Sequence, residues 1–336
     1  MVSAQGINVV KRNGRRNEAL DIDKIHAMVE YAVEDITGVS SSQVEMNSGL
    51  QFYDGISTDE IQKILIKSAS DLISLDAPNY TYVAARLLLF SLRKNLFHKL
   101  WDHPHFYDHT KKLVDLKLYD PQIMRDYDRK DFDRMEYWLK HDRDYDFTYA
   151  GLRQVIDKYL VQDRSTGQIY ETPQMMYMMI AATLFSKYPH NTRLIYVKKY
   201  YDAISKFQIN IPTPVMAGVR TPMRQYASCV LVDVADTLPS IFTSDMAIGY
   251  YTAQRAGIGI NAGRIRAINS KIRGGEIQHT GVIPFLKKFE ATVKSCTQNG
   301  VRGGCATVHF PIWHREIEDI IVLKIIKEHR IIELDN

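Results

Sequence analysis

Residues 228–263 read SCVLVDVADTLPSIFTSDMAIGYYTAQRAGIGINAG. The first five residues form an apolar run typical of a strand, and residues 240–256 follow with helical periodicity. Residues 257–263 are rich in glycine and are expected to be extended. A strand, a helix and a second extended segment in this order predict a parallel α/β arrangement.

The glycines of this stretch are spaced as Gly257-x-Gly259-x-x-x-Gly263, with Glu276 lying roughly twenty residues after the first of them. A dinucleotide-binding loop follows a strand and opens a helix. Gly257 instead follows the expected helix, and we interpret it as the C-cap of that helix. The order of elements and the glycine spacing therefore disfavour a nicotinamide-binding domain.

Composition sets limits on the class of protein. The 336 residues are 45% hydrophobic and 24% charged, enough for about two or three globular domains. A net charge of +4 is too balanced for a protein that coats nucleic acid, and local positive clusters facing small phosphates fit better. The N-terminus lacks the apolar region of a signal peptide, and no apolar run is long enough to span a bilayer. We expect a soluble, cytoplasmic protein.

The cysteines are Cys229, Cys296 and Cys305, which show neither C-x-x-C metal spacing nor a secreted disulfide framework. Thr213, Ser228 and Cys229 carry hydroxyl or thiol groups near expected strand starts, where α/β barrels place loops or chemistry. Taken alone, Cys229 could equally be a residue that only packs.

Residues 296–305 form a glycine-rich loop that carries Gln298 and Arg302. This loop could transmit the binding of one ligand to the site of another, or it could be a plain surface loop. Further helices are expected at residues 282–293 and 316–323.

The N-terminal part begins with an extended run at residues 7–11, and Asn13-Gly14 then predicts a tight hairpin with basic residues at its tip. Helices are expected from Asp21 or Asp23, from Thr58 as an N-cap, and over residues 79–97. A basic hairpin on a small helical bundle could hold a triphosphate. The alternative is a solvated basic hairpin.

The middle part reads as connecting helices and loops over residues 100–146, then as helices over residues 149–160, 174–185 and 191–205, with a turn at 163–167. Residues 101–109, WDHPHFYDH, resemble a metal-binding cluster through His103, His105 and His109. No second cluster accompanies them and Pro104 makes a turn, so a structural role is favoured. We expect no metal site in this chain.

Several longer motifs resemble one family. They include KRNG, DIDKIH, QFYDGIST, APNYTYVAARL, KYLVQDRSTGQIYET, PTPVMAGVRTPMRQYASCV, QRAGIGINAGRIRA, HTGVIPF and SCTQNGVRGG, between residues 7 and 324. Together they resemble the large, catalytic subunit of class I ribonucleotide reductase, in its enterobacterial and tailed-phage form. The resemblance implies an ATP-cone at residues 5–98, a helical domain with a connecting segment at 99–218, and the first part of a ten-stranded α/β barrel at 219–336.

The resemblance also implies the roles of particular residues. In the cone, the residues that bind ATP or dATP are Lys11, Glu18, Asp21, Lys24, Thr58 and Lys94. Gln62 stands where relatives that dATP inhibits often have His, which favours binding over inhibition.

In the barrel, the implied substrate contacts are Thr213, Ser228, Cys229 and Gly257. The implied specificity-effector residues are Asp236, Thr237, Leu238, Arg266, Arg273, Gln298 and Arg302. Cys229 would be one of two thiols that reduce the ribose 2′ position and end as a disulfide, and its partner thiol is not found in this sequence.

The implied ligands are ATP or dATP and deoxynucleoside triphosphate effectors, with a diiron-tyrosyl radical in a separate small subunit. The implied partners are that small subunit, a second copy of the large subunit, and thioredoxin or glutaredoxin as reductant, with no nucleic acid and no membrane.

After Lys324 the sequence reads IIKEHRIIELDN and departs from the family pattern. We interpret this as the N-terminal portion of a split large subunit, which needs a second polypeptide to complete it. An artefact of sequencing or splicing is the alternative. Two other functions remain open: a nucleotide-sensing regulator built on an ATP-cone, which predicts paired cysteines that this chain lacks, and an inactive remnant.

Overall fold

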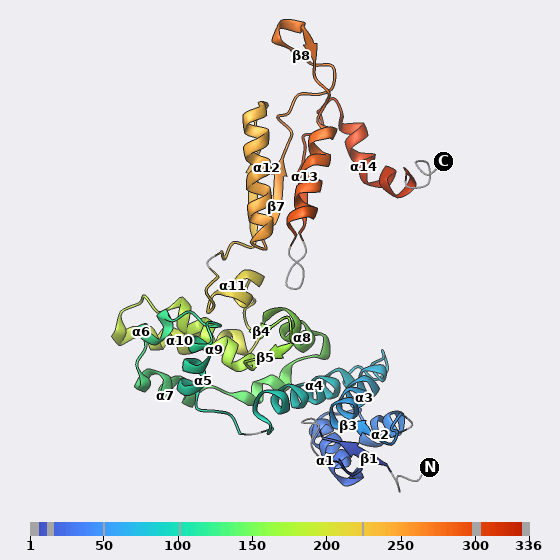
Figure 1. Cartoon of the computed structure of the whole chain (residues 1–336), viewed down its shortest axis with the longest axis vertical. Helices are drawn as coiled ribbons and strands as arrows, with labels where there is room; N and C mark the ends of the chain where they lie inside the picture. Colours follow the sequence, from blue (N-terminus) through green and yellow to red (C-terminus); the bar gives the residue numbers. More distant parts are fainter. Residues whose placement is uncertain are drawn as a thin grey trace. The chain divides into compact units, whose positions relative to one another are not determined.

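The computed structural model describes residues 7–11, 17–49, 51–100, 102–223, 225–297 and 304–330. The chain divides into two compact units (Figure 1). The first unit comprises Met1–Ile211 with Val215–Arg224, and the second comprises Pro212–Pro214 with Gln225–Asn336. Each unit is considered by itself below.

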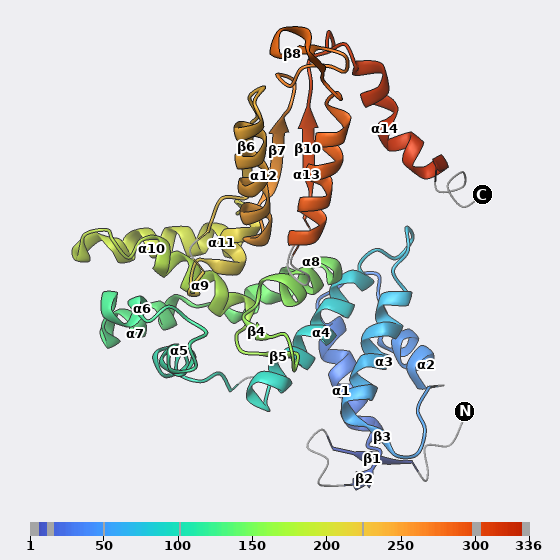
Figure 2. The same cartoon turned by 45° about the horizontal axis from the view of Figure 1, so that its top comes forward.

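The N-terminal part of the first unit is a small sheet beside helices (Figure 2). Strand β1 pairs with β2 in antiparallel register and with β3 in parallel, giving the order β2–β1–β3. The elements are β1 (Asn8–Val10), β2 (Asn17–Ala19), α1 (Ile22–Val33), α2 (Ser41–Gly49), β3 (Ile56–Ser57), α3 (Thr58–Asp71) and α4 (Tyr80–Phe97). The predicted hairpin strands and the helices α1, α3 and α4 are confirmed, whereas α2 was not anticipated. The hairpin tip at Asn13-Gly14 lies outside the described residues.

Helix α3 begins one residue earlier than a Thr58 N-cap would require. Ser57 is the N-cap, and it forms a capping box with Glu60: the Ser57 Oγ accepts from the Glu60 backbone N–H, and the Glu60 carboxylate accepts from the Ser57 N–H. Two N-terminal donors are satisfied in this way. Thr58 is therefore the first residue of the helix, where its backbone N–H belongs to the unbonded first turn.

The rest of the first unit is mainly helical. Its elements are α5 (Phe106–Asp115), α6 (Gln122–Asp126), α7 (Arg129–Trp138), the 3₁₀ helix η1 (His141–Asp146), α8 (Tyr149–Gln154), the π-helical turn η2 (Val155–Tyr159), β4 (Gln162–Asp163), β5 (Gln168–Ile169), α9 (Pro173–Leu184) and α10 (His190–Ser205). The helix predicted at residues 149–160 changes to π geometry at Val155, and the turn predicted at 163–167 joins a short hairpin. Helix α9 is buried almost all round, because its residues are apolar on every face.

A buried ion pair fixes the base of the β4–β5 hairpin. Arg220 Nε donates to Glu171 Oε2 at 2.9 Å, and both side chains are fully buried. The Glu171 carboxylate also accepts from the Val161 N–H at 2.6 Å and from the Tyr119 hydroxyl. A buried carboxylate with this many donors is fully satisfied. These bonds hold the base of the β4–β5 hairpin rigidly against the helices of the first unit.

The second unit is built on a parallel sheet. Its elements are β6 (Cys229–Asp233), α12 (Leu238–Ala253), β7 (Gly257–Asn261), β8 (Lys271–Ile272), the 3₁₀ turn η3 (Arg273–Gly275), β9 (Ile277–Gln278), α13 (Ile283–Cys296), β10 (Ala306–His309) and α14 (Ile317–Arg330). The residues of α11 (Thr213–Gly218) are divided between the two units. Strands β10, β7 and β6 lie in that order and pair in parallel. This arrangement confirms the predicted α/β class, and the described residues contain no closed barrel.

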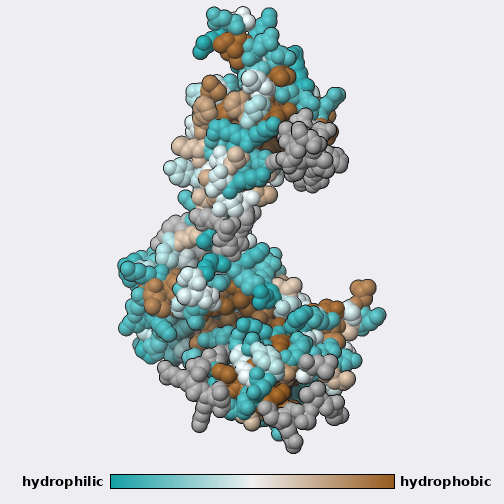
Figure 3. Space-filling model, turned by 45° about the vertical axis from the view of Figure 1, so that its right-hand side comes forward, coloured by the Kyte–Doolittle hydropathy of each residue, from teal (hydrophilic) through white to brown (hydrophobic). Residues whose placement is uncertain are grey.

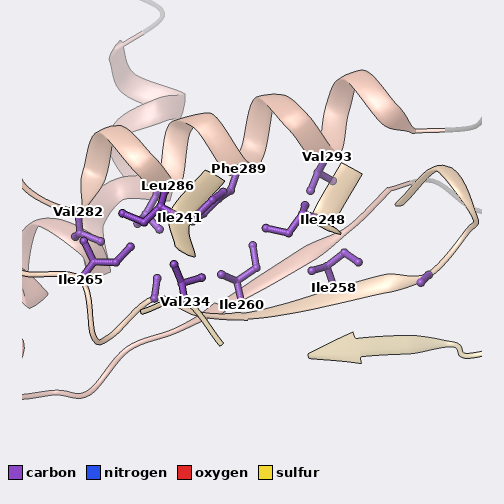
Figure 4. Close-up of a cluster of buried hydrophobic side chains, with 12 residues drawn as sticks. Val234, Ile241, Ile248, Ile258, Ile260, Ile265, Val282, Leu286, Phe289 and Val293 are labelled. Atoms are coloured by element: carbon purple, nitrogen blue, oxygen red, sulfur yellow. The ribbon is translucent and has the colours of Figure 1, made fainter. Parts of the chain in front are cut away.

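Helices α12 and α13 cover one face of this sheet. Ile258 and Ile260 of β7 point toward Phe289 and Val293 of α13 in the core cluster (Figure 4). Val230 and Val232 of β6 and Ala306 of β10 pack against the same cluster. Because side chains alternate along a strand, the residues between them point to the opposite face, which the helices leave uncovered.

Two local predictions were wrong in this unit. The residue with positive φ after α12 is Arg255, at 72°, while Gly257 is the first residue of β7 and not the helix C-cap. Thr213 begins the short helix α11 and not a strand.

On the surface in Figure 3 hydrophilic residues are mixed with apolar ones.

Candidate nucleotide sites and candidate active site

A cavity of about 870 Å³ lies beside the β2–β1–β3 sheet of the first unit. Strands β1 and β2, the first turns of α1 and α3, the end of α4 and the β4–β5 hairpin all contribute to it. The lining residues are Val9, Lys11, Glu18, Leu20, Asp21, Lys24, Ile25, Met28, Thr58, Ile61, Gln62, Lys94, Asn95, His98, Lys99, Leu100, Thr166, Gly167, Gln168 and Ile169. All six residues predicted for the cone site are among them.

Two helix N-termini meet at this cavity. Asp21 caps α1, its side chain accepting from the Lys24 N–H at 3.2 Å, and Thr58 opens α3. A helix N-terminus carries a partial positive charge and unbonded backbone N–H groups, which bind anions. The local structure therefore suits a phosphate group.

The charged side chains of the lining add to this positive potential. Four lysines and two carboxylates line the cavity. Lys11 pairs with Glu18, and Lys24 Nζ lies 2.9 Å from Asp21 Oδ2. The hydrogen bond with Asp21 raises the pKa of Lys24, and the same contact lowers the pKa of Asp21. Lysine supplies point charges that suit phosphate oxygens, so the set matches a polyphosphate.

Apolar residues also line the cavity and suit a base or sugar. Val9 comes from β1, Ile25 and Met28 come from α1, and Ile61 comes from α3. The buried Gln62 is held by its own contact, since its Nε2 donates to the Leu87 carbonyl at 3.0 Å. A fixed amide at this position is neutral at every pH, unlike a histidine.

The sequence analysis missed the contribution of the β4–β5 hairpin. Residues 166–169 come from the helical part of the first unit yet line the same cavity as Lys11 and Lys94. The DRSTGQ turn was visible as a loop signal, but no local pattern could reveal that it reaches the cone. Only the packing of α4 against β5 brings the two together.

A second group of predicted residues meets in the second unit. Asp236 and Thr237 lie at the N-terminus of α12, and Arg266 follows β7. Asp236 Oδ2 accepts from Arg266 Nε at 2.7 Å, and Oδ1 accepts from the Arg266 backbone N–H at 3.1 Å. Thr237 is the N-cap of α12, and Leu238, its first residue, is exposed. A helix N-terminus with an arginine held beside it is a suitable site for phosphate.

Arg273 lies on the β8–β9 hairpin, where it is exposed and has a φ of 49°. Arg266 Nη1 donates to the carbonyl of Lys271 in the same hairpin at 3.1 Å, which links the two segments. The base of the hairpin is held by Glu316, a buried residue whose Oε2 accepts from the Ile268 N–H at 2.9 Å and the Val282 N–H at 3.1 Å. Sequence reasoning missed Glu316, whose partners are far from it along the chain.

The predicted catalytic residue lies on the uncovered face of the sheet. Cys229, the first residue of β6, is exposed and pairs in register with Gly257 of β7. The Gly257 N–H donates to the Ser228 carbonyl at 2.8 Å, so three of the four predicted substrate residues adjoin one another. Thr213 belongs to the same unit. Gln298 and Arg302 lie outside the described residues.

Three family profiles match this chain in order. They are described as ATP cone domain (residues 7–95), ribonucleotide reductase all-alpha domain (residues 145–224) and ribonucleotide reductase barrel domain (residues 227–335). Ribonucleoside-diphosphate reductase 1 subunit alpha of Salmonella typhimurium is 53% identical over 320 residues, which are 95% of this chain and 42% of the relative. The Escherichia coli protein of the same name gives the same values, and the alpha subunit of Enterobacteria phage T4 is 45% identical over 336 residues, 98% of this chain and 44% of its own.

The chain belongs to the ribonucleotide reductase alpha-subunit family. It corresponds to the N-terminal region of that subunit, with an ATP-cone, a helical domain and the start of the barrel domain. It spans about two fifths of the length of the relatives it matches. The ATP-cone match supports binding of a nucleotide effector.

Each of the histidines near residue 105 contacts a different partner. His103 stacks on His141, His105 pairs with Asp133 and Glu136, and His109 bonds the Tyr170 carbonyl. Within the described ranges, one group could converge on an ion: Asp128, Asp131 and His190. Arg193 already donates to Asp131 at 2.9 Å and supplies the positive charge there. No helix among the described residues is both long and apolar enough to cross a membrane.

Proposed function

We propose that this chain forms the allosteric sites and part of the active site of a ribonucleoside-diphosphate reductase alpha subunit. The observation that carries the proposal is the pairing of Cys229 with Gly257 on the uncovered face of a parallel sheet, within a chain that matches the barrel domain of this family. A glycine beside the thiol lets a ligand approach the backbone closely. An exposed cysteine on that face can reach a substrate bound there.

The chemistry of Cys229 follows from its thiol. Two thiols together supply two electrons and become a disulfide, while the ribose 2′ carbon loses its hydroxyl as water and gains a hydrogen. The second thiol, and the residues that start the radical reaction, would come from the part of the alpha subunit that this chain does not match. A dithiol protein such as thioredoxin or glutaredoxin would then reduce the disulfide by thiol–disulfide exchange.

The two nucleotide sites would have separate roles. The cavity around Lys11 and Lys94 would bind ATP or dATP and control overall activity. The group at Asp236, Thr237 and Arg266, with Leu238 and Arg273 beside it, would bind a deoxynucleoside triphosphate that selects the substrate. Gln298 and Arg302 would complete that second site.

The partners follow from the same function. A small subunit with a diiron-tyrosyl radical would start the reaction in the reducing cytoplasm of the cell or of a phage host. A second copy of the alpha subunit would pack against α12. This helix carries an exposed apolar stripe at a spacing of four residues, made of Leu238, Phe242, Met246 and Tyr250.

The test is reduction of cytidine diphosphate with ATP present, by this chain together with the remaining part of the alpha subunit, the small subunit and a dithiol. Multiple turnovers are expected, and Cys229→Ser should abolish them while nucleotide binding persists, because serine cannot form a disulfide. Full turnover in the Cys229→Ser protein would overturn the proposal. A chain that binds nucleotides but never joins a reductase would instead support the regulator or the inactive remnant.

A further inference from the structure

The first row of the uncovered sheet face carries two cysteines. The pairing of Ala306 with Ile258 and the hydrogen bond from the Ile258 N–H to the Cys305 carbonyl, at 3.0 Å, place Cys305 opposite Gly257. Cys229 lies opposite the same glycine on its other side. The row therefore reads Cys229, Gly257, Cys305 across β6, β7 and the start of β10.

Both thiols point away from the helices. Val230 and Ala306, which adjoin the two cysteines, pack against the core under α12 and α13. Alternation along each strand turns Cys229 and Cys305 to the other face, and both are exposed. Because Gly257 has no side chain, no side chain of β7 stands between them.

The spacing of the row fixes what the pair can do. Neighbouring strands lie about 4.8 Å apart, so the two Cα atoms are separated by roughly 10 Å. A disulfide requires a Cα separation below about 7 Å. While the sheet is intact the two thiols cannot bond to each other, so Cys305 is not the redox partner of Cys229.

We propose that Cys305 is a second thiol of the substrate site, lining it across Gly257 from Cys229 and open to covalent modification that a bound ribonucleoside diphosphate blocks. This inference rests on the proposed function, because it takes the face that carries Cys229 as the substrate face. A ligand that lies over Gly257 and reaches Cys229 on one side contacts Cys305 on the other. Alkylation there forms a sulfur–carbon bond, expels iodide from iodoacetamide and releases the thiol proton to water.

The third cysteine provides an internal control. Cys296 lies near the end of α13, and its Sγ would be 3.3 Å from a Cβ placed on Gly249 of α12. It therefore lies between the two helices, on the covered side of the sheet. A ligand on the uncovered face cannot touch it.

The experiment is timed iodoacetamide labelling of the complete alpha subunit that contains this chain, read for each cysteine by mass spectrometry, with and without cytidine diphosphate. At a ligand concentration ten times its Kd, labelling of Cys229 and Cys305 should slow about tenfold, because only the unliganded fraction reacts. Labelling of Cys296 should not change.

Each other outcome overturns a different claim. If the ligand protects Cys229 but not Cys305, this inference fails and the proposed function stands. If calorimetry detects binding while neither cysteine is protected, both fail. If the ligand protects Cys296 equally, a conformational change of the whole protein causes the protection. Direct contact of the ligand with Cys305 is then disproved.

A bulky variant gives an independent measurement. Cys305→Phe should weaken cytidine diphosphate binding about tenfold or more by filling the space beside Gly257, while ATP binding in the cone of the same protein stays unchanged. Unchanged diphosphate affinity in this variant would also overturn the inference.

Discussion

Arg93 and Asp144 form an ion pair buried within the first unit, with Arg93 Nη2 lying 3.3 Å from Asp144 Oδ2 and the two side chains 1% and 0% exposed. Arg93 also donates to the His141 carbonyl at 2.8 Å, and Asp144 accepts from Gln174 of α9 at 2.9 Å. The next residue of α4 is Lys94, which lines the nucleotide cavity. Two successive residues of α4 therefore have different roles. Lys94 lines the cavity, and Arg93 holds α4 against η1.

We expect Arg93→Met to lower the free energy of unfolding by about 3–5 kcal/mol, because it leaves the Asp144 carboxylate buried without its cation. The adjacent variant Lys94→Met should change stability by less than about 1 kcal/mol, since its ammonium lies at a cavity wall. Urea unfolding measures both. The double variant Arg93→Met/Asp144→Asn should recover part of the loss, and equal stability of the two single variants would contradict this assignment.

The stacked pair His103 and His141 predicts an acid-sensitive first unit. Their ring centroids are 3.7 Å apart, and burial lowers the pKa of His103 to about 4 and that of His141 to about 2. Between these values and 6.5 the unfolded chain binds more protons than the folded chain, so stability falls as the pH drops through that window. Asp144 acts in the opposite direction, because burial raises its pKa to about 6.

The measurement is the free energy of unfolding at several pH values between 7 and 4 for the wild type and for His103→Phe/His141→Phe. The double variant should lose less stability on acidification. The same slope in both proteins would show that other groups cause the acid sensitivity.

Lysines in the cavity should control binding of ATP to the cone. Lys11→Ala and Lys94→Ala each remove one charged donor, so each should weaken ATP binding by about 1.5–3 kcal/mol, or roughly tenfold to hundredfold. Lys63→Ala is a matched control, because Lys63 lies on α3 outside the cavity and pairs with Asp59. Calorimetry checks all three. Effector binding in the second unit should persist, and its loss alongside ATP binding would point to unfolding.

Arg266 should couple effector and substrate. Its removal takes away a fork-shaped phosphate ligand held beside the N-terminus of α12, so Arg266→Ala should reduce effector affinity about tenfold or more. Arg264→Ala is the control, because Arg264 pairs instead with Asp233, at 3.0 Å. The readout is the reduction of competing diphosphates with and without effector. Unchanged, effector-dependent substrate choice in Arg266→Ala would place the specificity site elsewhere.

Among the glycines near the base of the β8–β9 hairpin, Gly281 should be the one whose replacement by alanine destabilises the protein most. Its φ is 92°, and an added Cβ would lie 2.5 Å from Glu316 Oε1, the carboxylate that holds the Ile268 and Val282 amides. Gly281→Ala should cost about 2–4 kcal/mol and speed hydrogen exchange of those two amides. Gly38→Ala, with a φ of 75° and no neighbour within 4 Å, should cost only about 1 kcal/mol. Equal costs would mean that backbone strain alone decides the effect.

The sequence by itself determined most helices and the parallel class of the second unit, because apolar periodicity and capping residues act over a few neighbouring positions. The strand at Cys229 and the helices α1, α4 and α9 lie within a few residues of their predicted bounds. Periodicity could not place α2, whose apolar and polar residues are not segregated on opposite faces. Nor could it distinguish Ser57 from Thr58 as the cap, since both residue types cap well.

The tertiary structure decided which of these residues meet. The β4–β5 hairpin reaches the cone cavity, Glu316 closes the hairpin between Ile268 and Val282, and Cys305 joins the row of Cys229. Each relationship joins residues between about thirty and more than a hundred positions apart, and it depends on strand register or on helix packing. Local patterns carry no information on such contacts, because burial of a shared core and pairing of backbone groups fix them only when the whole unit folds.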